Sequence, residues 1–153
     1  VEPALAGLWA GSFWLMFTAG RILAGLYTRR VKTHTLVRIC LLLALSGALL
    51  LGWNPAPWVS LLGVALSGFA IAPIYPALVS GTGARVGQRH TANTIGMQVG
   101  SAGMGGAVIP ALAGVLAQNI SLEVIPFYLA GLFTLASGLY WLSIRLEPKD
   151  GLG

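Results

Sequence analysis

Charged residues are scarce in this sequence, and acidic residues are the scarcest of them. Only 8% of the 153 residues are charged, with 4 Asp and Glu against 9 Lys and Arg, whereas an ordinary soluble domain has about 25%. The composition therefore excludes a typical soluble domain. No carboxylate in this sequence is placed to carry a proton inside a membrane, because all of them lie outside the long apolar stretches, at Glu2, Glu123, Glu147 and Asp150.

Cysteine and histidine are also rare, which excludes several kinds of chemistry. The single cysteine, Cys40, cannot form an internal disulfide. His34 and His90 lie in separate gaps between apolar stretches with no Cys, Asp or Glu cluster beside them, so a metal site is not expected. The sequence has no Ser, His and Asp set for nucleophilic catalysis and no phosphate-binding loop. We predict that the protein is not an enzyme and uses no cofactor.

Apolar residues dominate instead, at 56% of the chain with a mean hydropathy of +0.82. A helix needs about 20 mainly apolar residues to cross a bilayer, and five stretches meet this length: residues 4–27, 36–53, 58–80, 92–117 and 124–144. None alternates in polarity as a barrel strand would. We predict an all-α integral membrane protein with five transmembrane helices in contact with the lipid bilayer. The net charge of +5 does not indicate nucleic acid, because the basic residues occupy short gaps rather than a polar face.

Basic residues follow the first, third and fifth stretches but not the second and fourth. They are Arg29, Arg30, Lys32, Arg38, Arg85, Arg89, Arg145 and Lys149. Because Lys and Arg gather on the cytoplasmic side, we expect the amino end outside and the carboxyl end in the cytoplasm. The chain opens VEPALAG, without an initiator Met or a signal peptide. We therefore expect residues 1–153 to be one partial transmembrane bundle whose upstream part is missing.

Polar residues concentrate in the first, third and fourth stretches, which predicts that these helices line a cavity while the other two face lipid. Gln98 and Ser101 are three residues apart, hence on nearly one helix face, and could bind a sugar or other polar solute or a neighbouring helix. Trp14 is either a stacking platform for a ring-shaped ligand or a packing residue. These three residues and Tyr75 are the candidate solute contacts.

Two features predict irregular or closely packed helices. In GFAIAPIYPALVSG, Pro73 and Pro76 flank Tyr75 and should loosen the helix, either as a purely structural kink or as part of a gate or site. The spacing of Gly96 with Gly100 predicts a face on which helices approach closely. Gly7 and Gly11 repeat the same spacing in the first stretch, and such faces could also let helices slide during a conformational cycle.

The chain resembles the last five helices, eight to twelve, of a major facilitator superfamily transporter. The residues that carry the resemblance are Gly20-Arg21, Gly25 and Arg29-Arg30, with the PIYP and MGGAVIPALAG stretches. Among members it is most similar to fucose-permease-like and related bacterial sugar or drug carriers. The resemblance implies secondary transport of a small solute by alternating access in a bacterial inner membrane. It also implies an amino-terminal half of the same protein as partner and protons as a candidate coupling ion.

The family pattern also exposes a departure. The loop motif G-x-x-x-D-R-x-G-R, with its glycine at Gly25, places Arg29 where the family has Asp and Arg30 at the first Arg. The positive end of the fourth helix would repel Arg29, so the usual clamp does not carry over. In the family, helices eight, ten and eleven border the cavity while nine and twelve lie outside. This arrangement agrees with the concentration of polar residues in the first, third and fourth stretches of this chain.

Arg21 and the overall function each have two interpretations. Arg21 lies nine residues before Arg30, about 13 Å deeper along a helix. Its side chain could reach back to the cytoplasmic headgroups or belong to the inner gate of a carrier, which we favour over the solute pocket.

The alternative to a transporter is a membrane scaffold or assembly subunit that transports nothing.

Overall fold

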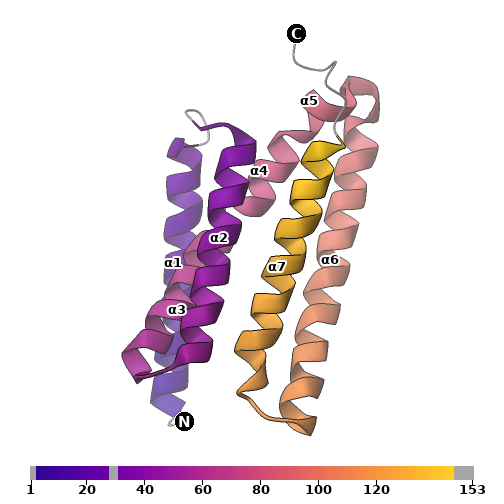
Figure 1. Ribbon diagram of the computed structural model, residues 1–153. Coiled ribbons are helices and arrows are strands. Elements are labelled where there is room, and N and C mark those ends of the chain that lie inside the picture. Colours follow the sequence, from indigo (N-terminus) through magenta and orange to yellow (C-terminus); the bar gives the residue numbers. More distant parts are fainter. Residues whose placement is uncertain (1–2, 28–30, 147–153) are drawn as a thin grey trace.

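The computed structural model describes residues 3–27 and 31–146, and this part of the chain is helical with no β-strand. Its helices run in chain order as a bundle of long rods joined by short connections (Figure 1). Their bounds are α1 Pro3–Tyr27, α2 Thr33–Trp53, α3 Pro57–Ile71, α4 Ile74–Ser80, α5 Thr82–Val86, α6 Gln88–Asn119 and α7 Val124–Arg145. The predicted all-α class is confirmed.

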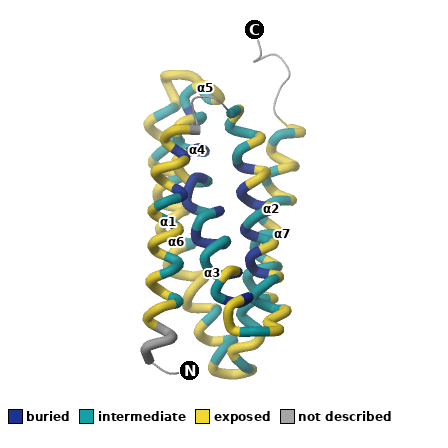
Figure 2. Tube along the Cα trace, turned by 90° about the vertical axis from the view of Figure 1, so that its left-hand side faces the viewer, coloured by how far each residue is buried: buried dark blue, intermediate teal, exposed yellow. Residues whose placement is uncertain are grey.

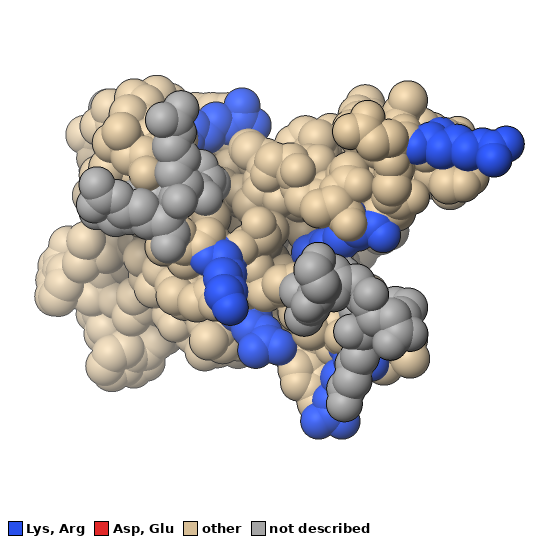
Figure 3. Space-filling model, turned by 90° about the horizontal axis from the view of Figure 1, so that it is seen from above, with Lys and Arg blue, Asp and Glu red and all other residues tan. Residues whose placement is uncertain are grey.

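Among the described residues, four helical segments are long and apolar enough to cross a membrane. They are Thr33–Trp53, Pro57–Val86, Gln88–Asn119 and Val124–Arg145. The 25-residue α1, which corresponds to the first predicted span, is long enough but is not in this set. Lys and Arg side chains are spread over the upper end of the bundle, where no Asp or Glu is visible (Figure 3).

The best-packed part of the bundle is a group of three helices. Helix α3 packs against both α1 and α2, and α2 also packs against α7. Buried positions concentrate on α2 and α3 (Figure 2), where many side chains are small, as at Ala44, Ala48 and Ala70. Small side chains let helix backbones approach closely, which is how helices associate without a hydrophobic driving force in lipid.

Glycines make the closest approaches, but at other positions than the sequence pattern predicts. A Cβ added to Gly47 would lie 2.8 Å from Gly63 O, and one added to Gly63 would lie 2.7 Å from Gly47 O. The helices α2 and α3 therefore touch backbone to backbone. By contrast, a Cβ added to Gly7, Gly11, Gly96 or Gly100 would have no described atom within 4 Å apart from its chain neighbours and its own helix backbone. Spacing identifies a smooth face, but it does not say whether a second helix covers that face.

Two helices begin earlier than the apolar stretches predict. His34 lies in the first turn of α2 and His90 in the first turn of α6, so neither residue is in a gap. Helices extend past the hydrocarbon into the headgroup region, where polar residues are solvated, and a hydropathy pattern detects only their apolar part. His34 Nδ1 lies 3.2 Å from Tyr140 Oη, which links the start of α2 to α7.

Candidate functional site

The third apolar stretch is broken at the first of its two prolines. Helix α3 ends at Ile71 and α4 begins at Ile74. Pro73 is buried and Pro76 is exposed. Because Pro73 has no N–H, Phe69 O lacks the amide donor that a continuous helix would supply four residues later. The break therefore leaves a backbone carbonyl that needs a neighbour.

Gly20 of α1 is that neighbour. A Cβ added to Gly20 would lie 2.6 Å from Phe69 O and 3.0 Å from Ala72 Cβ. Only a residue without a side chain allows this approach, and it brings the polarised Cα–H groups of Gly20 toward the freed carbonyl, a weak but favourable contact. Gly20, one of the predicted gate residues, thus contacts the end of α3 at Phe69 and the adjoining Ala72, next to Pro73 in the chain.

Arg21 follows Gly20 directly and is exposed. Its Cζ lies 4.8 Å from the centroid of the Phe17 ring, a cation–π distance. Phe17 is one turn toward the amino end of α1, so the guanidinium points to the middle of the helix and away from the basic end of the bundle. This direction is opposite to the one that reaching the headgroups at the basic end requires.

Trp14 contacts the same phenylalanine. Its ring meets Phe17 edge to face at 5.7 Å between centroids, and it meets Phe13 in the same way at 5.5 Å. The Trp14 side chain is nevertheless 62% exposed. The structure thereby joins Trp14 and Arg21 through Phe17, which sequence reasoning did not single out although residues 13, 17 and 21 share the four-residue spacing of one helix face.

Gln98 of α6 is held by a residue that the sequence analysis missed. Thr82, which is buried at the start of α5, has its Oγ1 3.0 Å from Gln98 Oε1 and 3.1 Å from Leu78 O. One hydroxyl proton can serve only one of these acceptors at a time. Within the described residues no hydrogen bond involves the Gln98 amide NH₂ group. Gln98 is therefore anchored to its neighbour and still has two donors to offer.

The remaining candidates are dispersed. Ser101 is exposed one turn from Gln98, and Tyr75 on α4 is 39% exposed. Gly25 is exposed, and no other helix of the described chain lies within 4 Å of a Cβ added there. Arg29 and Arg30 lie outside the described residues. In the part of the chain that the structure covers, no hydrogen bond or ring contact joins any two of Trp14, Tyr75, Gln98 and Ser101.

The helices that carry Tyr75 and Gln98 both contact α2 or α7. Ala77 of α4 is buried against Val37 and Leu41 of α2, and Tyr128 Oη of α7 donates to Ile109 O of α6 at 3.1 Å. In the view of Figure 1, α1 and α6 lie at opposite sides of the bundle with α2 and α7 between them.

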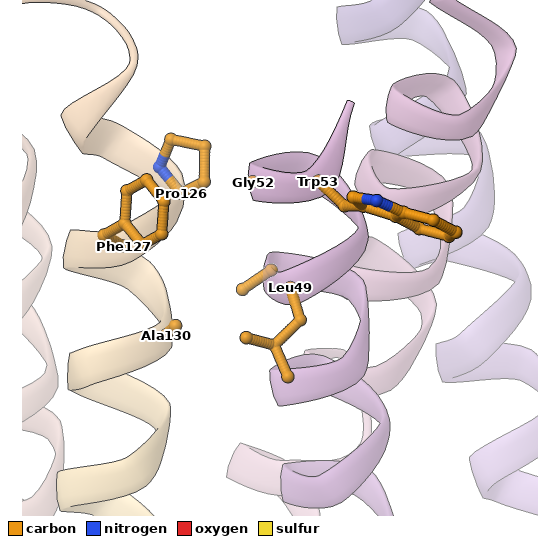
Figure 4. Close-up of a pocket in the computed structure, with 7 residues that line it drawn as sticks. Leu49, Gly52, Trp53, Pro126, Phe127 and Ala130 are labelled. Carbon is orange, nitrogen blue, oxygen red and sulfur yellow. The ribbon is translucent and has the colours of Figure 1, made fainter. Parts of the chain in front are cut away.

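The interface between α2 and α7, called the α2–α7 seam below, contains two surface pockets, or hollows, of about 180 Å³ and 230 Å³. The first is lined by apolar residues such as Leu49 and Phe127, which face each other across it, while the Trp53 ring points away (Figure 4). No candidate residue lines either hollow.

The described residues lack the pattern of a metal site and include groups that bind polar solutes. No group of three or more His, Cys, Asp or Glu side chains in this part of the chain could hold a metal ion. The groups that the candidate helices do present are a guanidinium, an indole, an amide and hydroxyls. Such groups can hold a polar solute by hydrogen bonds and stacking without changing it.

Comparison with known proteins identifies the family. No curated protein and no solved structure matches the chain significantly. The family model described as Major Facilitator Superfamily matches residues 1–152, which is nearly the whole sequence. With its apolar helices, this match means that the protein is an integral membrane protein and that the chain belongs to the major facilitator superfamily of secondary transporters.

Proposed function

We propose that this chain is the carboxyl-terminal part, helices eight to twelve, of a carrier that moves a small organic solute by alternating access. In this proposal α1, α4 and α6 border the solute path, and α2 and α7 face lipid. The upstream helices complete the path. The basic end of the bundle lies in the cytoplasm of a bacterial cell, because Lys and Arg gather on that side of inner-membrane proteins.

The observation that carries the proposal is how polar side chains are satisfied on the two sets of helices. Hydroxyls on both sets of helices bond carbonyls of their own helix four residues earlier: Ser46 Oγ of α2 donates to Leu42 O at 2.9 Å, and Thr18 Oγ1 of α1 donates to Trp14 O at 2.9 Å. Such residues expose no unmet donor to lipid. Gln98 and Arg21 instead retain N–H donors that hydrocarbon cannot satisfy, so water or a solute must reach them.

The candidate groups favour a sugar-like or similar small organic molecule. Trp14 offers a largely exposed ring face for the apolar side of a cyclic solute. Gln98 and Ser101, one turn apart, offer an amide and a hydroxyl for its polar groups. Tyr75 follows the helix break, where interrupted helices of carriers bind their ligands. Among the described residues the one acidic side chain is Glu123, which precedes the first residue of α7. Coupling to protons would therefore require a carboxylate from outside the described helices.

Replacing Gln98 with alanine should weaken solute binding. We expect KM to rise about tenfold, as for the loss of a buried neutral hydrogen bond at the upper end of its range. The measurement is uptake by the full-length protein in proteoliposomes across a panel of sugars and other small solutes. Asn119→Ala is the matched control, because its amide donates to Val115 O of its own helix at 2.8 Å and lies at the other end of α6. Its KM should not change.

Two outcomes would count against the proposal. If Gln98→Ala lowers thermal stability but leaves KM unchanged, then the residue only anchors α5 through Thr82. If the intact protein moves no solute of the panel in either direction, a scaffold or assembly subunit becomes the better description.

A further inference from the structure

The α2–α7 seam has a hollow at each end, and only one of them carries charge. The hollow at the Trp53 end is lined by apolar and small residues of both helices. The hollow at the basic end has a similar apolar wall that includes Leu41, Leu42 and Trp141, but Arg38 also lines it. Arg145 lies against the same wall, with its Cζ 3.6 Å from the centroid of the Trp141 ring.

Both arginines can reach a ligand from the membrane surface. Arg38 is in the second turn of α2 and Arg145 is the last residue of α7, and both are exposed. Stacking on Trp141 covers one face of the Arg145 guanidinium and leaves the N–H groups at its edge available. The 3.2 Å contact of His34 Nδ1 with Tyr140 Oη joins the two helices at this end. The groove is therefore a junction of two helices with cations at its mouth.

We propose that this groove binds an anionic phospholipid of the surrounding bilayer. Arg38 and Arg145 bind the phosphate by charge-assisted hydrogen bonds, and one acyl chain lies along Leu41, Leu42 and Trp141. The volume of about 230 Å³ is below the roughly 300–1,000 Å³ of pockets that enclose a whole small ligand, which suits a segment of one chain. Basic pockets between helices on the cytoplasmic side are where anionic headgroups bind. The site is separate from the proposed solute path.

The test compares phosphatidylglycerol with phosphatidylcholine. The full-length protein in detergent is mixed with equal amounts of both lipids, and native mass spectrometry measures which one it retains. We expect phosphatidylglycerol to be preferred. Each arginine near the surface contributes about fivefold to anionic lipid binding, so Arg38→Gln should weaken retention about fivefold and the double variant Arg38→Gln/Arg145→Gln roughly 25-fold.

Two further variants separate this site from a general basic surface. Arg89→Gln removes an exposed arginine at the start of α6 that does not line the groove, and it should retain lipid as the parent does. Leu42→Trp fills the groove without removing a charge, and it should lose the preferred lipid. Soluble glycerol phosphate should not displace the lipid.

Three results would overturn the proposal. They are equal losses in Arg89→Gln and Arg38→Gln, equal retention of the two lipids by the parent, and displacement of lipid by glycerol phosphate, which would indicate a site for a free phosphate. The substituted side chains are exposed, so the variants should fold, and circular dichroism checks their helicity.

Discussion

Alanine at Gly47 or Gly63 is expected to destabilise the protein by about 1–3 kcal/mol. The added methyl group would lie within 2.8 Å of a carbonyl oxygen of the facing helix, and a backbone carbonyl cannot turn aside as a flexible side chain can. Helices α2 and α3 would have to separate, which also loosens the packing of small side chains beside them. The measurement is unfolding of the protein in detergent micelles, followed by circular dichroism with heat or denaturant.

The double variant distinguishes this contact from a general intolerance of alanine. Once one methyl group has separated the helices, the second should cost little, so the two effects should be strongly non-additive. Gly96→Ala is the matched control, because no other described helix lies within 4 Å of a Cβ added there and alanine is favoured over glycine in a helix by up to about 1 kcal/mol. Equal destabilisation of Gly47→Ala and Gly96→Ala would contradict the packing that the structure shows.

Arg21→Ala should lower the maximal transport rate about tenfold or more, equivalent to ~1.4 kcal/mol in the rate-limiting step, with little change in KM. We place Arg21 at the inner gate, where it would bias the conformational cycle rather than hold the solute. Transport by the full-length protein in proteoliposomes measures both quantities. An arginine costs up to about 2.5–3.5 kcal/mol in a membrane helix, the value at the helix centre, and a cation–π contact returns roughly 0.5–2 kcal/mol. The variant should therefore lose activity and keep or gain stability.

The decisive result is that the transport rate falls while the stability of the protein is kept or increased. Arg89→Ala is the control, since it removes an exposed arginine from the start of α6 and should leave the rate unchanged. If Arg21→Ala transports as the parent does, the residue serves only as a charge tolerated in the membrane. If KM rises while the maximal rate holds, Arg21 belongs to the solute pocket instead.

Much of the architecture could be predicted because lipid imposes one strong rule on sequence. A backbone in hydrocarbon must satisfy its own hydrogen bonds, so long apolar stretches become helices. This rule led to the helical class and to helices at all five apolar stretches. It did not place the helix starts, since the turns that contain His34 and His90 are polar. It indicated that the two prolines loosen the third helix, but not that the interruption falls between Ile71 and Ile74.

The candidate site was less predictable because its properties depend on neighbours distant in the chain. Gln98 was an obvious polar residue, but its anchoring by Thr82 arises only when α5 folds back onto α6. Arg21 was an obvious charge, and the four-residue spacing to Phe17 was visible in the sequence. The direction of its side chain was not, because a long flexible arginine can extend toward either end of a helix.

Composition and the spacing of apolar stretches determined by themselves that this chain is helical and lies in a membrane. The scarcity of carboxylates and histidines also kept metal and acid–base chemistry out of the expected functions. Tertiary structure alone decided which glycines are contacts. Gly47 and Gly63 meet across two helices while Gly96 and Gly100 face no neighbour in the described chain. The reason is physical: periodicity records the surface of one helix, and contact requires the complementary surface of another.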